Sequence, residues 1–283
     1  METITEKILL TSRIVKGKIA AASGFYELYD RYSFMGFVPY YDQARCVIKY
    51  FVKEKKYNKI GCLYQDDEFG TIALKGVKDQ LATYNMELAA AESYKRGATE
   101  FSSQIAKLRK AGVQLVVLGT VIRETVGAWR EGKKIGWNVD MSGLTPAYTQ
   151  YAVDLIVKAG SKPDGLYTSG QTEYPYEDSP LPTVREWYKR HVAWYGKPPD
   201  LPTTAGYWGV HHFSMAAQKV GRDLTREKFI DALETMGEVR DDIFGGAPIT
   251  FTNKSHQGAS NVFMFQVKEG KWRRISDIVE YRK

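Results

Sequence analysis

A regular alternation of short apolar runs with longer amphipathic segments, between Lys59 and Gly170, constrains the fold of this chain most. The segments between the runs are long enough for a helix and too long for a hairpin turn. Strands separated by helical segments form a parallel sheet with helices on both faces. The sequence therefore predicts an α/β fold. The predicted strands cover residues 60–64, 86–93, 113–118, 139–142 and 165–168.

The segments between these strands carry helix signals, namely apolar positions at helical spacing and recognisable ends. The predicted helices cover residues 69–84, 99–111 with Thr99 as the N-cap, 120–135, and a segment that Pro146 opens.

The chain changes character after Gln171. Six prolines interrupt residues 171–204. An α/β core followed by helices and a β tail indicates that the chain leaves one lobe and later returns to it. The predicted elements are helices at 184–195, 203–220 and 225–236 and short strands at 249–251, 262–267 and 271–275, with a turn at Glu269 and Gly270.

Composition narrows the class of protein. Of the 283 residues, 43% are hydrophobic and 26% charged, which is typical of a globular protein. The net charge of +7 is spread along the chain, so no nucleic-acid partner is expected. Cys46 and Cys62 are too few for a disulfide scaffold or a tetrahedral zinc site and are expected to be buried thiols, with their pairing left open. The longest apolar run, near 115–122, is too short for a membrane span, and residues 1–18 lack the apolar core of a signal peptide.

The signatures of common enzyme classes do not occur. The sequence has no phosphate-binding loop, dinucleotide-binding glycine motif or serine-nucleophile elbow. His211 and His212 are adjacent on a predicted helix and point in different directions, so they do not form a metal-binding pair. Asp66 and Asp67, at the end of a strand, allow two interpretations: a Mg²⁺ site, or a helix cap with favourable charge at a helix N-terminus.

The predicted strand ends offer a binding cleft, because open α/β sheets bind ligands outside the carboxyl ends of their strands. Hydroxyl groups, helix N-termini and apolar side chains meet at these ends and suit a small anion with an apolar part. They supply no nucleophile with its base. The residues concerned are Phe69, Gly70, Thr120, Val121, Ile122, Thr145 and Pro146.

Three segments carry a resemblance to a known family. They are 64–70 (Tyr-Gln-Asp-Asp-Glu-Phe-Gly), 92–104 (Glu-Ser-Tyr-Lys-Arg-Gly-Ala-Thr-Glu-Phe-Ser-Ser-Gln) and 116–120 (Val-Val-Leu-Gly-Thr). From about Ile19 to its end, the chain resembles the type I periplasmic solute-binding proteins of ABC importers, in the leucine–isoleucine–valine-binding family.

The resemblance implies a two-lobed periplasmic-binding-protein type I fold, in which hinge closure traps a solute between two α/β lobes. The family's opening βα units have no counterpart here, so we expect an amino-terminally incomplete chain with a weakened first lobe. A first crossing strand is implied near 39–42. The implied division is 1–41 and 182–250 for the partial first lobe, 42–170 and 255–283 for the second lobe, and 171–181 and 251–254 for hinge crossings.

The function that the resemblance implies is capture of a small solute in the periplasm, without catalysis and without a cofactor. The implied partners are the solute and the permease and ATPase subunits of an ABC importer, with direct contact to the permease. A monomer is expected.

The resemblance also implies ligand contacts. A loop at 22–25 resembles the one that holds the ligand carboxylate, and Phe69 stands where the family often has a tyrosine over the ligand. Val121 and Ile122 stand at a position that is aromatic in the amino-acid binders. The full set of expected contacts is Ser23, Gly24, Phe25, Tyr40, Tyr41, Phe69, Thr120, Val121, Ile122 and Thr145.

One departure from the family pattern bears on the ligand. Leu144 and Thr145 stand where the amino-acid binders have the acidic residue that holds the ligand ammonium group. A buried ammonium group without a carboxylate partner is costly. We therefore expect a carboxylate ligand with an apolar or aromatic body in place of a free α-amino acid.

Two other functions fit the same sequence. One is a ligand-sensing module of the same fold that regulates a partner protein, although no DNA-binding helix-turn-helix segment is seen before the fold. The other is a metal-dependent α/β enzyme that uses Asp66 and Asp67.

Overall fold

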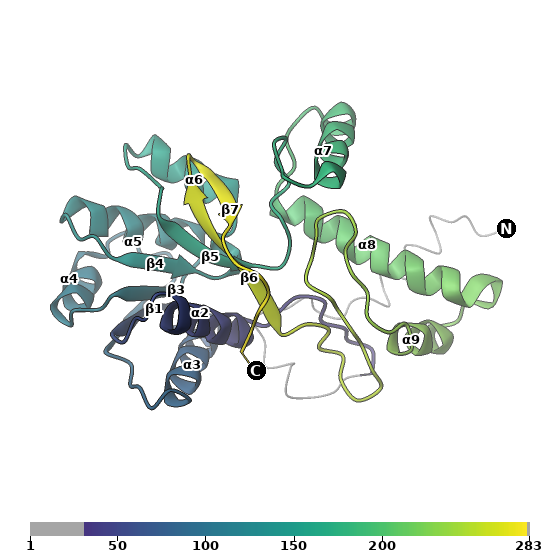
Figure 1. The fold of residues 1–283 in the computed structure, drawn as a ribbon, viewed down its shortest axis with the longest axis horizontal. Helices are drawn as coiled ribbons and strands as arrows, with labels where there is room; N and C mark the ends of the chain where they lie inside the picture. The colour runs from purple at the N-terminus through teal and green to yellow at the C-terminus, as the bar shows by residue number, and fades with distance from the viewer. Residues whose placement is uncertain (1–30, 282–283) are drawn as a thin grey trace.

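The computed structural model describes residues 31–281, and its centre is a mostly parallel β-sheet (Figure 1). Its strands are β1 (Ile60–Gln65), β2 (Ala90–Tyr94), β3 (Leu115–Gly119), β4 (Asp140–Gly143), β5 (Leu166–Gly170), β6 (Asn261–Lys268), β7 (Lys271–Arg274) and β8 (Val279–Glu280). They lie in the order β2-β1-β3-β4-β5-β6-β7, and β8 pairs with β6. Strands β1 to β5 pair in parallel, whereas β6 and β7 are antiparallel additions at one edge. The predicted α/β fold is confirmed.

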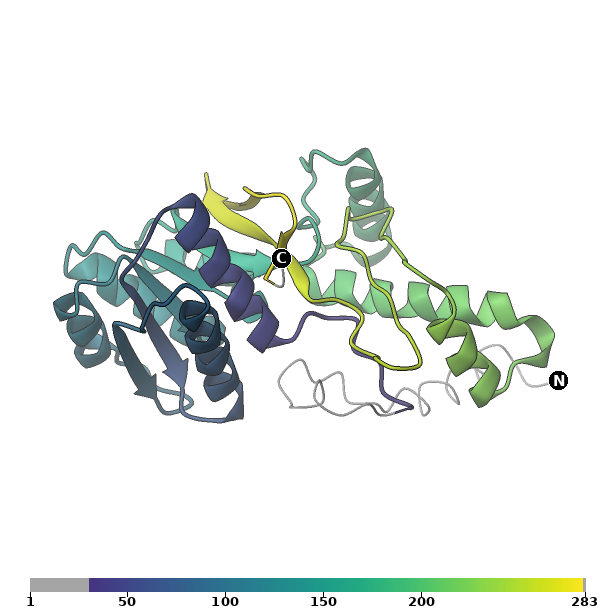
Figure 2. The same cartoon turned by 60° about the horizontal axis from the view of Figure 1, so that its bottom comes forward.

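Helices cover both faces of this sheet and extend beyond it (Figures 1 and 2). The helices are α2 (Tyr40–Glu54), α3 (Glu68–Ala82), α4 (Ser102–Lys110), α5 (Ile122–Lys134), α6 (Gln150–Lys158), α7 (Pro182–Tyr195), α8 (Leu201–Val220) and α9 (Arg226–Glu234), with 3₁₀ turns η2 (Thr145–Ala147) and η3 (Gly221–Asp223).

Strand β3 shows why the sheet needs cover on both sides. All five of its residues are buried. Leu115 and Val117 belong to a hydrophobic cluster with side chains of α2 and α3, whereas Val116 and Leu118 belong to a second cluster with α4, α5 and α6. Successive side chains of a strand point to opposite faces, so an uninterrupted apolar run predicts a strand that is packed on both faces.

Helices α7, α8 and α9 lie beyond the end of β5, to one side of the sheet (Figures 1 and 2). Phe213 of α8 packs on Phe229 of α9 with ring centroids 4.9 Å apart. Trp187 of α7 packs edge-on against Phe244, with ring centroids at 4.9 Å. The Trp187 contact belongs to a small separate cluster with Val184, whereas Phe229 belongs to the same hydrophobic cluster as Leu115 of the sheet.

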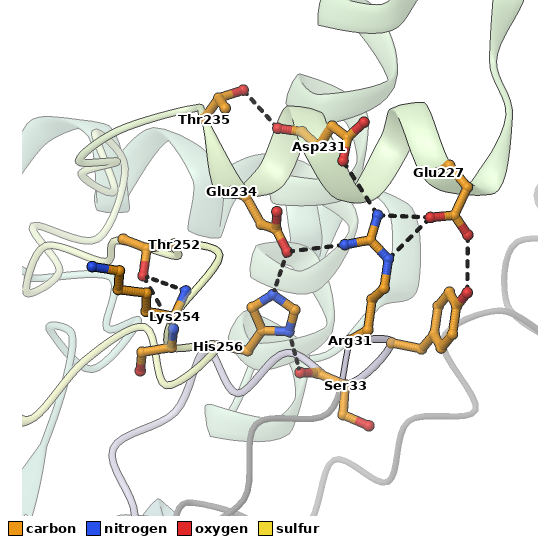
Figure 3. Close-up of polar contacts among 11 residues, drawn as sticks. Arg31, Ser33, Glu227, Asp231, Glu234, Thr235, Thr252, Lys254 and His256 are labelled. Atoms are coloured by element: carbon orange, nitrogen blue, oxygen red, sulfur yellow. Dashed lines mark hydrogen bonds and ion pairs between the residues drawn. The ribbon is translucent and has the colours of Figure 1, made fainter.

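A cluster of charged side chains fixes the described start of the chain to α9 (Figure 3). Arg31 donates through Nε and Nη2 to the Glu227 carboxylate, at 3.0 and 2.7 Å, and its Nη2 also lies 3.4 Å from Asp231. A guanidinium that donates two bonds to one carboxylate has a fixed orientation as well as a favourable charge contact. The pair therefore sets where the segment that leads into α2 begins.

His256 forms the buried end of the same cluster. Its ring nitrogens lie 3.0 Å from the Ser33 carbonyl oxygen and 2.9 Å from the Glu234 carboxylate, and its ring stacks on Phe34 at 3.7 Å. Met35 and Gln257 continue the contact as a parallel bridge. Three stretches that are distant in the sequence are thus joined at one place (Figure 3).

Helix α2 is the largest difference from the sequence prediction. The expected crossing strand near 39–42 is wrong, because the chain enters a helix at Tyr40. Pro39 has the extended backbone of a helix N-cap, with φ −56° and ψ 147°. The helix then buries one face, including Cys46, Val47 and Phe51, against the sheet. This packing outweighs the extended conformation that the family comparison implied.

Some predicted element ends are also corrected. Thr99 does not cap α4; the N-cap is Phe101, whose buried ring packs edge-on against Tyr94 at 5.4 Å, so packing sets this helix start. Pro146 opens only the turn η2, and Thr149 caps the following helix by accepting a hydrogen bond from the Tyr151 amide.

Two strand predictions also need correction, and one predicted turn is confirmed. The strand predicted from residue 86 begins at Ala90. Residues 249–251 form one isolated bridge, between Ile249 and Val239, in place of a strand. The predicted turn at Glu269 and Gly270 is confirmed between β6 and β7, with φ of 52° and 71°.

Cys46 and Cys62 are buried and free, as buried thiols were predicted. Burial raises the pKa of each thiol to about 12, so neither is a thiolate near neutral pH. Within residues 31–281, no helix has the length and apolar character that crossing a bilayer requires.

Candidate functional site

A small cavity lies between the carboxyl edge of the sheet and helix α8. Because β1 to β5 are parallel, their carboxyl ends meet at one edge. The space open to the centre of a water-sized sphere is about 20 Å³, so the cavity holds about one water molecule. It is lined by Phe37, Thr145, Gln171, Thr172, Leu201, Thr204, Ala205, Trp208, Asp241 and Phe244. The two sides of the cavity therefore come from segments that are distant in sequence.

Thr145 is the predicted site residue that lines this cavity. Its backbone amide and its hydroxyl group both donate to Oε1 of Gln43, each at 2.8 Å. The Ser169 hydroxyl donates to the same oxygen at 3.1 Å, and Nε2 of Gln43 donates to the Val38 carbonyl at 2.7 Å. Gln43 is 1% exposed. One buried amide therefore ties α2 to the ends of β4 and β5.

Gln43 was missed by sequence reasoning because no helix was predicted at 40–54. A glutamine in that stretch carries no motif of its own, and its role depends on contacts with residues more than 100 positions away. Gln171 has a similar role: its Oε1 accepts from the Val38 amide at 2.9 Å and its Nε2 donates to the Gly36 carbonyl at 3.2 Å. Together the two glutamines hold residues 36–38 against the edge of the sheet.

Tyr40 and Phe69 are brought together at the N-terminal ends of α2 and α3. Their rings meet edge-on with centroids 4.7 Å apart. Burial raises the pKa of the Tyr40 hydroxyl group, so it remains protonated. Tyr41 faces elsewhere, since its hydroxyl donates to Asp79 of α3 at 2.6 Å. None of these three residues lines the cavity described above.

Thr120, Val121 and Ile122 form the start of α5. The Thr120 and Thr125 hydroxyl groups share a buried hydrogen bond of 2.5 Å, so Thr120 already has a partner within this turn. Val121 is the helix N-cap and is half-buried, as is Ile122. The predicted contacts Ser23, Gly24 and Phe25 lie outside the described residues.

Two residues that line the cavity each have a buried polar atom without a hydrogen-bond partner among the described residues. These atoms are Nε1 of Trp208 and Oδ2 of Asp241. The other carboxylate oxygen of Asp241 accepts from the amides of Ile243 and Phe244, at 2.9 and 3.0 Å. Burial raises the pKa of the Asp241 carboxyl group. Sequence reasoning missed both residues, because neither follows a strand end.

His212 lies one helical turn after Trp208 and also has a buried polar atom without a hydrogen-bond partner in the described structure. Its Nδ1 lies 2.9 Å from the Trp208 carbonyl oxygen, which makes Nδ1 the protonated nitrogen. Its buried Nε2 has no partner within residues 31–281. Burial lowers the pKa of His212, so the ring is neutral near pH 7.

Asp66 and Asp67 are engaged in separate contacts. Asp67 caps α3 by accepting from the Gly70 amide at 3.2 Å, as one of the two interpretations predicted. Asp66 pairs with Lys95 at the surface. Among the described residues, no group of three or more histidine, cysteine, aspartate or glutamate side chains is placed to hold a metal ion.

Replacing Asp67 with alanine is expected to lower the free energy of unfolding by about 1 kcal/mol, because a helix cap is lost. Asp66→Ala should have a smaller effect, since its ion pair is exposed. Urea unfolding measures both, and adding Mg²⁺ should leave the melting temperature of each protein unchanged. A Mg²⁺-dependent rise in wild type that Asp67→Ala abolishes would show a metal site instead.

Comparisons with known proteins place this geometry in a family. A family model described as periplasmic binding protein matches residues 5–271. The chain belongs to this family. The family resemblance drawn from the sequence is thereby confirmed.

Relatives in this family are distant in sequence. The Leu/Ile/Val-binding protein homolog 8 of Brucella abortus is 20% identical over 227 residues, which are 77% of this chain and 54% of that protein. The Leu/Ile/Val-binding protein of Citrobacter freundii is 23% identical over 143 residues, or 50% of this chain and 38% of that one. This periplasmic binding protein thus spans about half the length of the curated relatives it matches.

Solved structures show the same fold. A branched chain amino acid ABC transporter protein from Thermus thermophilus, solved with bound valine, has a TM-score of 0.78 at 17% identity, covering 99% of this chain and 76% of its own. The fatty acid ABC transporter substrate-binding protein from Thermomonospora curvata has a TM-score of 0.76 at 20% identity, covering 89% and 66%. The periplasmic-binding-protein type I fold is confirmed.

Proposed function

We propose that this periplasmic binding protein is the solute-binding subunit of an ABC importer and traps one small solute between two lobes. The observation that carries the proposal is the cavity between the sheet edge and α8. Two of its lining residues, Trp208 and Asp241, each have a buried polar atom without a partner among the described residues. Buried polar atoms are normally hydrogen-bonded, and a solute would supply the missing bonds. The family and the fold support the same function.

The cavity is too small for a solute in the described conformation, so entry requires the two sides to separate. We assign residues 42–170 and 255–283 to one lobe, and 182–250 together with 1–41 to the other. Residues 171–181 and 251–254 are then the hinge crossings. Opening moves α8, with Trp208, away from Thr145, and closure around the solute restores their proximity.

The protein binds and releases its solute without converting it. The Thr145 and Thr204 hydroxyl groups in the lining donate to Gln43 and to the Leu201 carbonyl, and not to a base. Delivery requires a permease that contacts both lobes and an ATPase that drives transport. We place the protein in the periplasm as a monomer, with no cofactor.

The proposal is tested by calorimetry and thermal shift with two panels, one of amino acids and amines and one of aliphatic and aromatic carboxylic acids. At least one compound should bind saturably in a 1:1 ratio and raise the melting temperature. Mass spectrometry after incubation should recover that compound unchanged. Conversion of the compound, or no binding in either panel, would contradict the proposal.

A further inference from the structure

The turn that carries Asp241 is firmly held in place. Val239 and Ile249 exchange two backbone hydrogen bonds at its base, of 2.8 and 2.9 Å. At its tip, the Phe244 carbonyl accepts from the Glu173 amide at 2.9 Å, and the Ala247 amide donates to Gln171 at 2.9 Å. The turn is therefore fixed to the segment that follows β5, which also lines the cavity.

The turn itself needs only one of the two carboxylate oxygens of Asp241. Oδ1 satisfies the amides of Ile243 and Phe244. An asparagine at this position would offer the same acceptor oxygen without burying a charge. Asp241 is 5% exposed, and Oδ2 meets no donor in the described part of the chain. No group of the turn accounts for the second oxygen. His211 and His212 of α8 also act on the charge of Asp241, but neither donates a hydrogen bond to Oδ2 in the described structure. This oxygen therefore remains available to a solute.

Trp208 offers the opposite kind of group in the same cavity. It is 6% exposed, and its indole N–H has no acceptor among residues 31–281. A buried donor without an acceptor is costly, so this N–H favours a solute that supplies an acceptor oxygen. Its ring and those of Phe37 and Phe244 form aromatic walls, which attract a positively charged nitrogen.

We infer that Asp241 and Trp208 determine the class of solute: Asp241 binds a positively charged, hydrogen-bond-donating nitrogen, and Trp208 donates to an acceptor oxygen of the same molecule. This inference rests on the proposed function and specifies the solute. It replaces the expectation that nitrogen-bearing solutes are disfavoured because Leu144 and Thr145 are not acidic. A carboxylate does line the cavity, but it comes from the later part of the chain.

Asp241→Asn is the decisive variant, because it keeps the acceptor oxygen for Ile243 and Phe244 and removes the charge. Asp242→Asn is the matched control, since Asp242 is the exposed neighbour and the change in net charge is the same. The probes are L-leucine, 2-hydroxy-4-methylpentanoate, 4-methylpentanoate and isopentylamine, together with the other amino acids, amines and acids of the two panels.

Wild type should bind compounds that carry a protonated nitrogen. Asp241→Asn should weaken that binding about tenfold or more, as expected for the loss of one side of a buried charge pair. Asp242→Asn should bind like wild type. Trp208→Phe should weaken binding of compounds with both the nitrogen and the oxygen more than binding of the simple amine.

The unliganded proteins provide a second measurement. Since Oδ2 has no partner in the described structure, Asp241→Asn should melt at the same temperature as wild type or higher at pH 7. A melting temperature several degrees lower would show that Asp241 has a structural role and would overturn the inference.

The binding outcomes separate the two proposals. If wild type binds only nitrogen-free acids, or if Asp241→Asn binds amines as wild type does, the inference fails and the proposed function stands. If wild type binds nothing in either panel, the proposed function fails and the inference fails with it.

Discussion

Gln43→Leu should lower the free energy of unfolding by about 4 kcal/mol, because it removes the shared partner of several buried groups at once. The Thr145 amide, the Ser169 hydroxyl and the Val38 carbonyl would each lose a hydrogen bond to this side chain. Leucine has nearly the volume of glutamine, so the loss reflects polar groups left without partners. Urea denaturation of wild type and variant measures the difference.

Gln114→Leu is the matched control. The Gln114 Oε1 accepts from the amides of Asn58 and Lys59, at 2.9 and 3.1 Å, but the residue is exposed. Water can replace that acceptor, so the loss should stay below about 1 kcal/mol. Equal losses in the two variants would mean that Gln43 does not join the elements around the cavity as described.

The second large effect concerns Gly70, in the first turn of α3. A Cβ atom at this position would lie 1.9 Å from the Gln65 carbonyl oxygen and 2.6 Å from the Gln65 nitrogen. Both are backbone atoms of β1, so relief requires the helix to move away from the strand. Gly70→Ala should therefore lower the free energy of unfolding by about 3 kcal/mol or more.

Gly209→Ala is the matched control and should change the free energy of unfolding in the opposite direction. Gly209 lies within α8 and is exposed, and an added Cβ would meet no atom within 4 Å. Alanine favours a helix over glycine, so this variant should be more stable by about 1 kcal/mol. If Gly70→Ala is as stable as wild type, the close approach of α3 to β1 is wrong.

The sheet could be predicted because short runs of consecutive apolar residues mark strands such as β1 and β3. Residues 115–119 are apolar throughout, and such a run is typical of a central parallel strand. Strand ends also indicate where a ligand is expected, and Thr145, predicted on this ground, lines the cavity. Element ends such as that of α4 were less predictable, because the packing of one ring, Phe101, sets the helix start.

The other side of the cavity could not be predicted from local pattern. Trp208 lies in a predicted helix and Asp241 in a predicted loop, and neither position indicates a cleft. They meet the sheet edge because residues 244–247 bond to residues 171–173, about 70 positions earlier. A contact of this kind leaves no periodic signal in the sequence. For the same reason the family pattern points to Leu144 for an acidic residue, whereas the carboxylate that lines the cavity is Asp241.

The charged cluster around Arg31 and His256 has a mechanical consequence for the proposed closure. It fixes one end of residues 31–39 to α9, while the other end continues into α2 beside the sheet. Together with 171–181 and the return from α9 to β6, this makes three separate chain connections between the sheet and α7–α9. With one connection, the two parts could rotate relative to each other about any axis. Three connections restrict them to a hinge rotation. Closure around a solute then costs the two lobes little orientational entropy, so more of the contact energy remains as affinity.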